Sequence, residues 1–153
     1  MANQPTATIE VLNGGIVSQS LVVGVFNAQP GIISYTSGGN TFGVVLHANF
    51  QLADSAHPVA PGETVLIYCT GLGAVVSPPQ DGAAASGQIT MATPMVTVGG
   101  VSTPVAFSGL APGFVGLNQV NVTIPTTGVA SGNQPVVMTV NGTSSPAVLL
   151  PIK

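Results

Sequence analysis

The chain has 153 residues, only 3% of them charged, and its formal net charge is −3 at pH 7. A typical soluble domain carries about 25% charged residues, so solubility here must rest on uncharged polar side chains and exposed backbone. With one Lys or Arg in all, the chain cannot form the basic track that nucleic acids need or the basic cluster that binds anionic membranes. No apolar run approaches the roughly 20 helical residues that span a bilayer.

Hydrophobic residues make up 45% of the chain, and it contains 20 Gly and 13 Pro. This composition favours an all-β protein of short strands and many turns. A chain of this length fits one domain, or one domain with an appended element, and buries roughly 70% of its unfolded surface.

Alternating and β-branched stretches predict a series of short strands. In chain order they are Ala7 to Leu12, Ser20 to Phe26, Gly31 to Tyr35, Phe42 to His47, Glu63 to Thr70, Pro94 to Val98, Pro104 to Phe107, Leu117 to Ile124, Pro135 to Val140 and Ala147 to Ile152. Turn residues separate them at Asn13-Gly14-Gly15, Ser37-Gly38-Gly39-Asn40, Ala60-Pro61-Gly62, Gly99-Gly100 and Asn141-Gly142. So many short strands predict a sandwich, with an exposed loop from Ser77 to Gln88.

The clearest strand lies between Gly109 and Pro125. Within it, Val120, Val122 and Ile124 alternate with polar residues, which is the pattern of a strand with one buried face. Pro125 ends this strand because proline has no N–H to donate to a neighbouring strand.

The beginning and the end of the chain resemble one another. Ile9 to Val25 and Val137 to Ile152 both contain alternating apolar residues, then Asn-Gly, then Ser, then a second apolar stretch. We therefore divide the chain into an N-terminal hairpin, residues 1–27, and a sandwich domain, residues 28–153. The hairpin is either the remnant of a preceding domain or an element that pairs with a sheet edge of another molecule. Its candidate self-association residues are Ile9, Val11, Asn13, Gly14, Leu21, Val23 and Val25.

Four stretches carry a family resemblance: AQPGIIS at Ala28–Ser34, HPVAPGETVLIYCTGLG at His57–Gly73, PMVTVGGVSTPVAFSGLAPGFVGLNQVNVTIP at Pro94–Pro125 and VMTVNGTSSP at Val137–Pro146. They are similar to the Solibacter-type C-terminal domain of large secreted or surface bacterial proteins, which looks related to IPT/TIG domains. The resemblance implies an extracellular, immunoglobulin-like β-sandwich of short antiparallel strands, here with an additional N-terminal hairpin, and it implies no activity. The chain departs from the usual family pattern at His57, Cys69 and Asn118.

The ionisable residues are too few for most catalytic sites. His47, Asp54 and His57 could in principle bind a metal, but their spacing matches no known zinc motif, so we expect a solvated loop. Asp81 could join Asp54 in a weak calcium site at best. Cys69 alternates with apolar residues, which is typical of an inert core thiol. We expect no catalytic, cofactor or metal site, and no enzyme.

A phosphate-binding loop and an intramolecular isopeptide bond are also disfavoured. Gly71-Leu72-Gly73 follows a strand as a phosphate-binding loop would, but the third glycine and the following helix are missing, so a tight turn is expected. Lys153 is the only lysine and is terminal, which argues against an intramolecular isopeptide bond.

The leading hypothesis is therefore a non-catalytic structural or adhesive module that self-assembles head to tail by hairpin complementation, with itself or neighbouring domains as partners. The alternative is a carbohydrate- or other ligand-binding module, for which Tyr35 and Phe42, flanking one turn, are the candidate contacts. The start of the chain lacks the layout of a secretion signal. We favour a chain whose leader has been removed, located outside the cell or on its surface.

Overall fold

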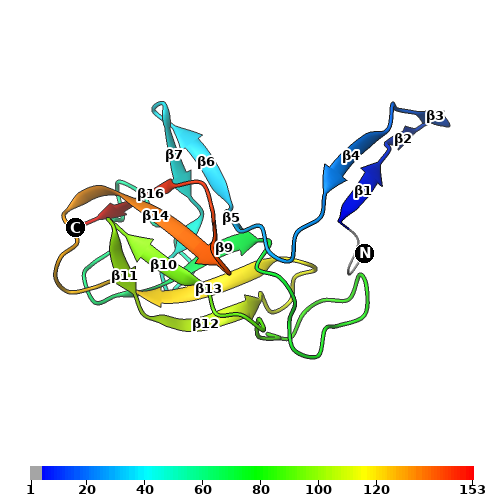
Figure 1. Cartoon of the computed structure of the whole chain (residues 1–153). Coiled ribbons are helices and arrows are strands. Elements are labelled where there is room, and N and C mark those ends of the chain that lie inside the picture. Colours follow the sequence, from blue (N-terminus) through cyan, green and yellow to red (C-terminus); the bar gives the residue numbers. More distant parts are fainter. Residues whose placement is uncertain (1–4) are drawn as a thin grey trace.

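The computed structural model describes residues 5–153. These residues form strands and turns without any helix, and most strands pack as two facing sheets (Figure 1). Nearly all strand pairs are antiparallel, and neither sheet closes into a barrel. The structure confirms the predicted all-β sandwich with an additional N-terminal hairpin.

One sheet has five strands in the order β12-β13-β9-β5, with β8 also pairing with β9. Their bounds are β5 Gly31–Ile32, β8 Val45–Leu46, β9 Thr64–Thr70, β12 Val105–Leu110 and β13 Asn118–Thr123. The central pair follows the alternation of the sequence. Val65, Ile67 and Cys69 of β9 are fully buried and point inward.

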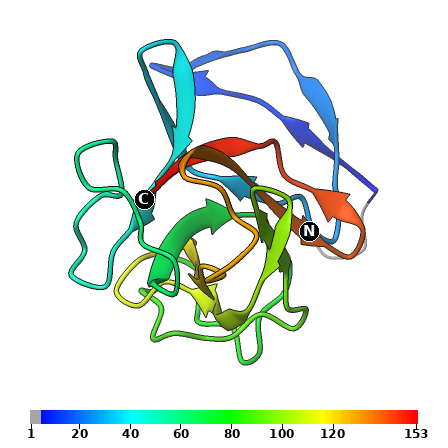
Figure 2. The same cartoon turned by 90° about the vertical axis from the view of Figure 1, so that its left-hand side faces the viewer.

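The other sheet has seven strands in the order β11-β10-β14-β16-β7-β6, with β15 pairing with β14. Their bounds are β6 Ser34–Ser37, β7 Asn40–Gly43, β10 Met95–Val98, β11 Val101–Thr103, β14 Gly132–Val140, β15 Thr143–Ser144 and β16 Val148–Ile152. Figure 2 shows the orange and red strands β14 and β16 as a layer above the green and yellow strands β9 and β13.

The strand order is that of an immunoglobulin domain. In chain order, β5, β9, β10, β11, β12, β13, β14 and β16 take the places of strands A, B, C, C′, D, E, F and G. One sheet is then ABED and the other contains C′CFG, as in that fold. The chain changes sheets at Pro104, between β11 and β12. Strand β7 also pairs in parallel with β16, at Phe42 and Leu149.

The core lies between the two sheets. Most of its side chains come from alternate positions of β9, β10, β13, β14 and β16, and Leu72 and Ile124 follow directly after β9 and β13. The largest fully buried side chains are Ile67, Leu72, Ile124, Met138 and Leu150. Every buried side-chain nitrogen or oxygen of the described residues has a hydrogen-bond partner. All strands of the two sheets lie within residues 28–153.

The region of strand A differs from the prediction. Two strands were expected, Gly31 to Tyr35 and Phe42 to His47, but the structure has four short ones, because the hairpin β6–β7 leaves the five-stranded sheet between β5 and β8. Its turn is Gly38-Gly39, where both glycines have positive φ. Strand A is therefore interrupted by a hairpin that joins the opposite sheet and projects from the sandwich (Figure 1).

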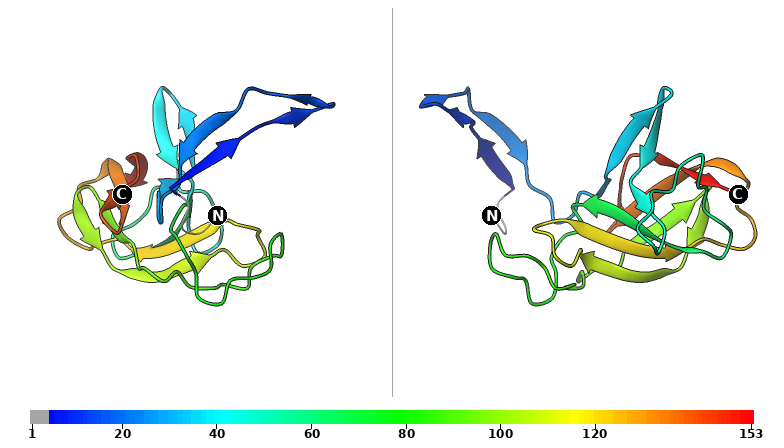
Figure 3. Two further views of the ribbon diagram at one scale, coloured as in Figure 1. Left: turned by 45° about the vertical axis from the view of Figure 1, so that its right-hand side comes forward. Right: turned by 180° about the vertical axis from the view of Figure 1, so that it is seen from behind.

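A second hairpin precedes the sandwich. It consists of β1 Thr6–Ile9 paired with β4 Leu21–Gly24, and β2 Leu12–Asn13 paired with β3 Ile16–Val17. We call residues 5–25 the N-terminal hairpin, because the N–H of Val25 also donates to the carbonyl of Pro5. It stands clear of both sheets in Figure 1 and in the right-hand view of Figure 3, at the end of the sandwich away from the C-terminus. Among the described residues its strands pair only with one another.

The predicted turn of this hairpin is wrong by one residue. Asn13 was expected to form the turn with Gly14, but Asn13 lies in β2 opposite Ile16, and the turn is Gly14-Gly15, with φ of 56° and 84°. Positive φ at both turn positions matches the twist of the flanking strands. The corresponding prediction at Asn141-Gly142 is confirmed, since both residues have positive φ between paired Val140 and Thr143.

Candidate functional site

The N-terminal hairpin reproduces the hairpin of β14, β15 and β16, which are strands F and G of the sandwich. One constant shift along the chain carries its Cα partner pairs onto theirs: Thr6↔Gly24 onto Asn133↔Pro151, Ile9↔Leu21 onto Val136↔Val148, Leu12↔Val17 onto Thr139↔Ser144, and Asn13↔Ile16 onto Val140↔Thr143. The two hairpins therefore have the same register. Regular pairing is also interrupted at the same place in both, after Ile9↔Leu21 in one and after Val136↔Val148 in the other.

A serine forms that irregularity in both hairpins. The N–H of Ser18 donates to the carbonyl of Val11 over 2.9 Å, and the N–H of Val11 donates to Ser18 Oγ over 3.0 Å. The N–H of Ser145 donates to the carbonyl of Met138 over 2.8 Å, and Met138 N–H donates to Ser145 Oγ over 3.1 Å. Each hydroxyl then donates to the carbonyl of the next residue. In both hairpins the serine hydroxyl thus accepts the hydrogen bond that a backbone carbonyl would accept if the strand pairing were regular at this point.

The two hairpins differ in what covers them. Val136, Met138 and Val148 are 0%, 0% and 5% exposed in the core, whereas their counterparts Ile9, Val11 and Leu21 are 49%, 62% and 62% exposed. The counterparts of buried Leu150 and Ile152 are Val23 and Val25, which are half-buried. Five of the candidate self-association residues thus occupy core positions of an immunoglobulin hairpin. No facing sheet covers them.

The other two candidate residues lie at the end of the hairpin. Asn13 and Gly14 are both exposed. Asn13 takes the place of buried Val140, and Gly14 takes the place of the turn residue Asn141. The structure therefore places every residue of the set on one hairpin, with the apolar ones on one face.

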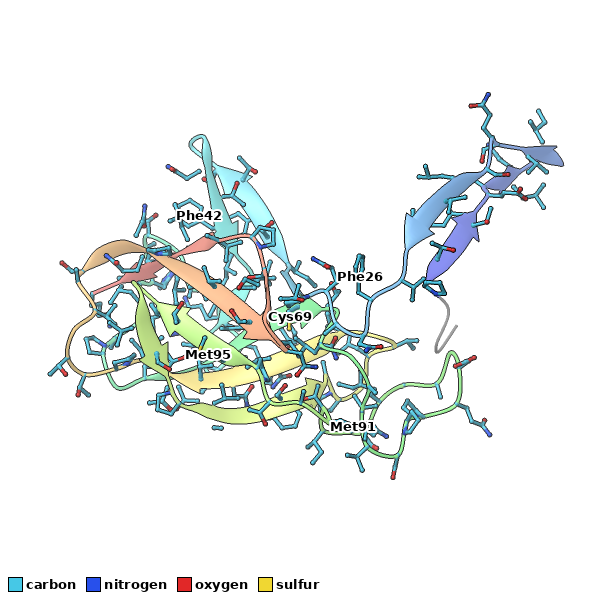
Figure 4. All side chains as sticks on the ribbon, in the orientation of Figure 1. Phe26, Phe42, Cys69, Met91 and Met95 are labelled. Atoms are coloured by element: carbon cyan, nitrogen blue, oxygen red, sulfur yellow. The ribbon has the colours of Figure 1, made fainter. Side chains whose placement is uncertain are left out.

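The opposite face of the N-terminal hairpin is apolar as well. Half of the large hydrophobic residues that are exposed in the described chain lie between Ile9 and Phe26. Those outside the core-like face are Leu12, Val17, Val22 and Phe26, whereas Ile16 lies on the core-like face opposite Asn13. Phe26 lies where the hairpin joins the sandwich (Figure 4). The one charged side chain, Glu10, accepts a hydrogen bond from Ser20. A strand that is apolar on both faces is typical of one covered on both sides.

The predicted ligand contacts Tyr35 and Phe42 are brought together by the β6–β7 register. Their ring centroids are 5.7 Å apart and their planes are inclined by 25°. They line a hollow of about 270 Å³ together with Ser37, Leu52, Asp54 and Ser55. Burial and the charge of Asp54 raise the pKa of Tyr35, so its hydroxyl stays protonated and able to donate.

A larger hollow lies on the outer face of the five-stranded sheet. This groove measures about 580 Å³ and is lined by Leu46, Phe50, Leu66, Tyr68, Pro112, Phe114 and Gln119. Phe50 and Phe114 are 67% and 52% exposed. None of the lining residues is charged. The groove was not predicted from the sequence, although the run Val65 to Cys69, apolar at successive positions, is a signal that β9 has two apolar faces.

The acidic and histidine residues form two separate pairs. His47 Nδ1 is bound to Glu63, and the other ring nitrogen lies 3.1 Å from the carbonyl oxygen of His57. The hydrogen bond with Glu63 raises the pKa of His47. His57 Nδ1 lies 3.1 Å from Asp54, whose pKa is lowered mainly by the backbone N–H of His57. No cluster of three His, Cys, Asp or Glu side chains that could hold a metal ion occurs in residues 5–153.

The remaining candidates lie in the core or in turns. Cys69 is fully buried, and burial raises the pKa of its thiol to about 12, which keeps it a thiol at neutral pH. Gly71 and Gly73 both have positive φ and form the turn that leaves β9. A Cβ on Gly71 would lie 1.9 Å from the carbonyl oxygen of Gln29, so this turn requires glycine because backbone passes close to it.

A scan against protein-family models and searches of the curated proteins and of the solved structures found no match for this chain. Within residues 5–153 there is also no helix long and apolar enough to cross a membrane. Any function must therefore be argued from the surfaces just described.

Proposed function

We propose that this chain is a non-catalytic structural module that assembles head to tail, with the N-terminal hairpin of one copy covered by the next copy. The observation that carries the proposal is the correspondence of the two hairpins. Residues with core positions in the F–G hairpin are buried, and the same positions in the N-terminal hairpin are exposed or half-buried. Exposed apolar area of this kind favours association, at about 25 cal/mol per Å² removed from water.

The donor and the acceptor in such a contact are different surfaces of one chain. A contact of this type is heterologous, so it produces either a closed ring or an open filament. The sandwich of residues 28–153 already has its own F–G hairpin, so a neighbour's hairpin must add to its outside rather than replace a strand. This favours a filament of complete domains, and the family resemblance of the sequence makes an adhesive role outside the cell part of the proposal.

Charge substitution in the hairpin tests the proposal. Leu21→Lys places an ammonium group on the core-like face, where it is solvated in a single molecule but buried and unpaired in a filament. An unpaired buried charge costs about 3–5 kcal/mol, so assembly should weaken by at least a hundredfold. Negative-stain microscopy and sedimentation should show filaments of the unaltered chain and monomers of the variant.

The matched control is Met95→Lys. Met95 is 54% exposed on β10, within the sandwich and apart from the hairpin (Figure 4), so this variant carries the same charge change without touching the donor. It should assemble like the unaltered chain. The proposal fails if the unaltered chain is monomeric at high concentration, or if Leu21→Lys assembles as well as Met95→Lys.

A ligand-binding module is the second candidate, and the stacked Tyr35 and Phe42 rings beside Asp54 favour it. An aromatic face next to hydroxyl and carboxylate groups is a chemistry that recognises sugars. Glycan-array binding that Tyr35→Ala abolishes would support this function. An array without binding by the unaltered chain would eliminate it.

A further inference from the structure

We propose that the acceptor for the N-terminal hairpin is the groove on the outer face of the five-stranded sheet of a second copy. This inference rests on the proposed function and deepens it, because it names the receiving surface. The sheet would then carry an F–G hairpin on each face: its own against the inside and the copy from a neighbour against the outside.

The first argument is the pattern of β9. Its inward residues Val65, Ile67 and Cys69 are fully buried, and its outward residues Leu66 and Tyr68 are apolar but only half-buried. A central strand that is apolar at successive positions is typical of a sheet covered on both faces. In the single chain the outer face of β9 lacks that cover, and the N-terminal hairpin is the element of the same chain that has apolar surface to provide it.

The second argument is the backbone of Phe50. This residue forms one wall of the groove and has φ of 65°, a conformation that is strained for a bulky side chain. A turn holds Phe50 in this conformation. The turn is closed by a 2.9 Å hydrogen bond from the N–H of Phe50 to the carbonyl oxygen of His47. Strain of this kind persists mainly at functional positions. Here the strained backbone keeps the phenyl ring of Phe50 exposed to solvent at the edge of an apolar groove. Burial of this ring by another surface would be favourable.

The third argument is chemical match. Neither the groove nor the core-like face of the hairpin contains a charged residue, and Glu10 points to the other face because it alternates with Ile9 and Val11. Phe114, which also lines the groove, packs against Tyr68 with ring centroids 6.3 Å apart. An uncharged groove lined by Phe50, Tyr68 and Phe114 suits an insert that bears aliphatic side chains, which is what Ile9, Val11 and Leu21 present.

Two groove variants test the assignment. Phe50→Asn removes one wall and places at φ 65° a residue that tolerates this conformation, so thermal unfolding should be unchanged or occur at higher temperature. Phe114→Lys places a charge at a second aromatic residue that lines the groove, on an exposed turn. Each should raise the concentration needed for assembly by at least about tenfold, because a buried phenyl contributes more than the 1.4 kcal/mol that a factor of ten requires. Met95→Lys again serves as the control.

Mixing provides the decisive measurement. Leu21→Lys has an intact groove and a disabled hairpin, and Phe114→Lys has the reverse, so each alone should be monomeric. Together they should form a one-to-one complex that does not extend, visible by sedimentation as twice the monomer mass. Failure to form this complex, when each variant alone is folded and monomeric, overturns the assignment of the groove.

The outcomes also separate this inference from the proposed function. If Leu21→Lys abolishes assembly while both groove variants assemble normally, the hairpin is the donor but the groove is not its acceptor. If Leu21→Lys assembles normally, both proposals fall.

The dye ANS, which binds exposed apolar surface, gives an independent readout. A groove that still binds ANS in the filament, in a manner sensitive to Phe114→Lys, takes some other apolar ligand and overturns the inference.

Discussion

His47 and Glu63 illustrate how one ion pair can hold a loop at the residue scale. The pair joins the two ends of the segment that crosses between β8 and β9, and Glu63 also accepts a 2.9 Å hydrogen bond from the N–H of Ala60. Burial opposes ionisation of Glu63, but the hydrogen bonds from Ala60 and His47 outweigh it and leave the pKa of Glu63 lowered. The hydrogen bond with Glu63 raises the pKa of His47.

These two shifts give a window of pH in which the pair stabilises the fold. A raised histidine pKa contributes stability that is complete below the ordinary value of 6.5 and is lost as pH rises through the folded-state value. A lowered carboxyl pKa contributes stability that is complete above the ordinary value of 4.5 and is lost as pH falls through the folded-state value. The contribution is therefore greatest between these two values.

Glu63→Gln should lower the free energy of unfolding by roughly 1 kcal/mol at pH 5.5, as is usual for a partly exposed pair. The deficit should shrink as pH rises through the raised folded-state pKa of His47, for example on going to pH 9. Thermal unfolding across this range measures the effect, with Asp81→Asn as control, since Asp81 is an exposed carboxylate of the Ser77 to Gln88 loop. A deficit equal at both pH values would mean that the ion pair is not its source.

The sequence could identify these residues but not their partners. It grouped His47 with Asp54 and His57 because they are near in the chain. The structure pairs His47 with Glu63 instead, because β8 and the start of β9 are adjacent strands of one sheet. Strand pairing between distant segments decides which side chains meet, and a single sequence does not reveal that pairing.

At the scale of elements, local patterns were reliable where one strand faces one core. The alternation of Val120, Val122 and Ile124 predicted the inward face of β13, and these residues are fully buried. The repeat of the two hairpins was also visible in sequence. Its exact register was not, because Asn-Gly is a strong turn signal and Asn13-Gly14 competes with Gly14-Gly15. A slip of one residue would have moved every following side chain to the other face.

The groove could not be predicted from any one element. Its walls come from the end of β8, the turn at Phe50, the outer face of β9 and the turn at Phe114. Each of these features is ordinary in isolation. Only the folded arrangement shows that these side chains surround one hollow, and that the hairpin has no comparable surface of its own chain to cover it.

At the scale of the whole molecule, the sandwich has a well-packed core, but two outer surfaces of the chain expose large apolar side chains. The core domain has no unsatisfied buried polar side chain among its described residues, yet the hairpin and the outer face of the five-stranded sheet leave large apolar side chains in water. An isolated two-stranded hairpin is at best marginally stable in water. Association between copies would cover the apolar side chains of the hairpin and those of the outer sheet face in one contact. For this reason we propose that the function of the chain is assembly.

The near absence of charge predicts how such an assembly responds to salt. With one Lys or Arg and four acidic residues, the chain has almost no ion pairs for salt to screen, and the proposed interface contains none. Screening acts within about 8 Å at physiological ionic strength and would weaken an interface held by charges. Apolar burial is instead strengthened by salts such as sulfate. The filament should therefore keep its length distribution in 1 M sodium chloride, and its critical concentration should fall in ammonium sulfate, both measured by light scattering and microscopy. Filaments that dissolve on raising sodium chloride would contradict an uncharged interface and direct attention to Glu10 and Lys153, the charged side chains nearest the two ends of the chain.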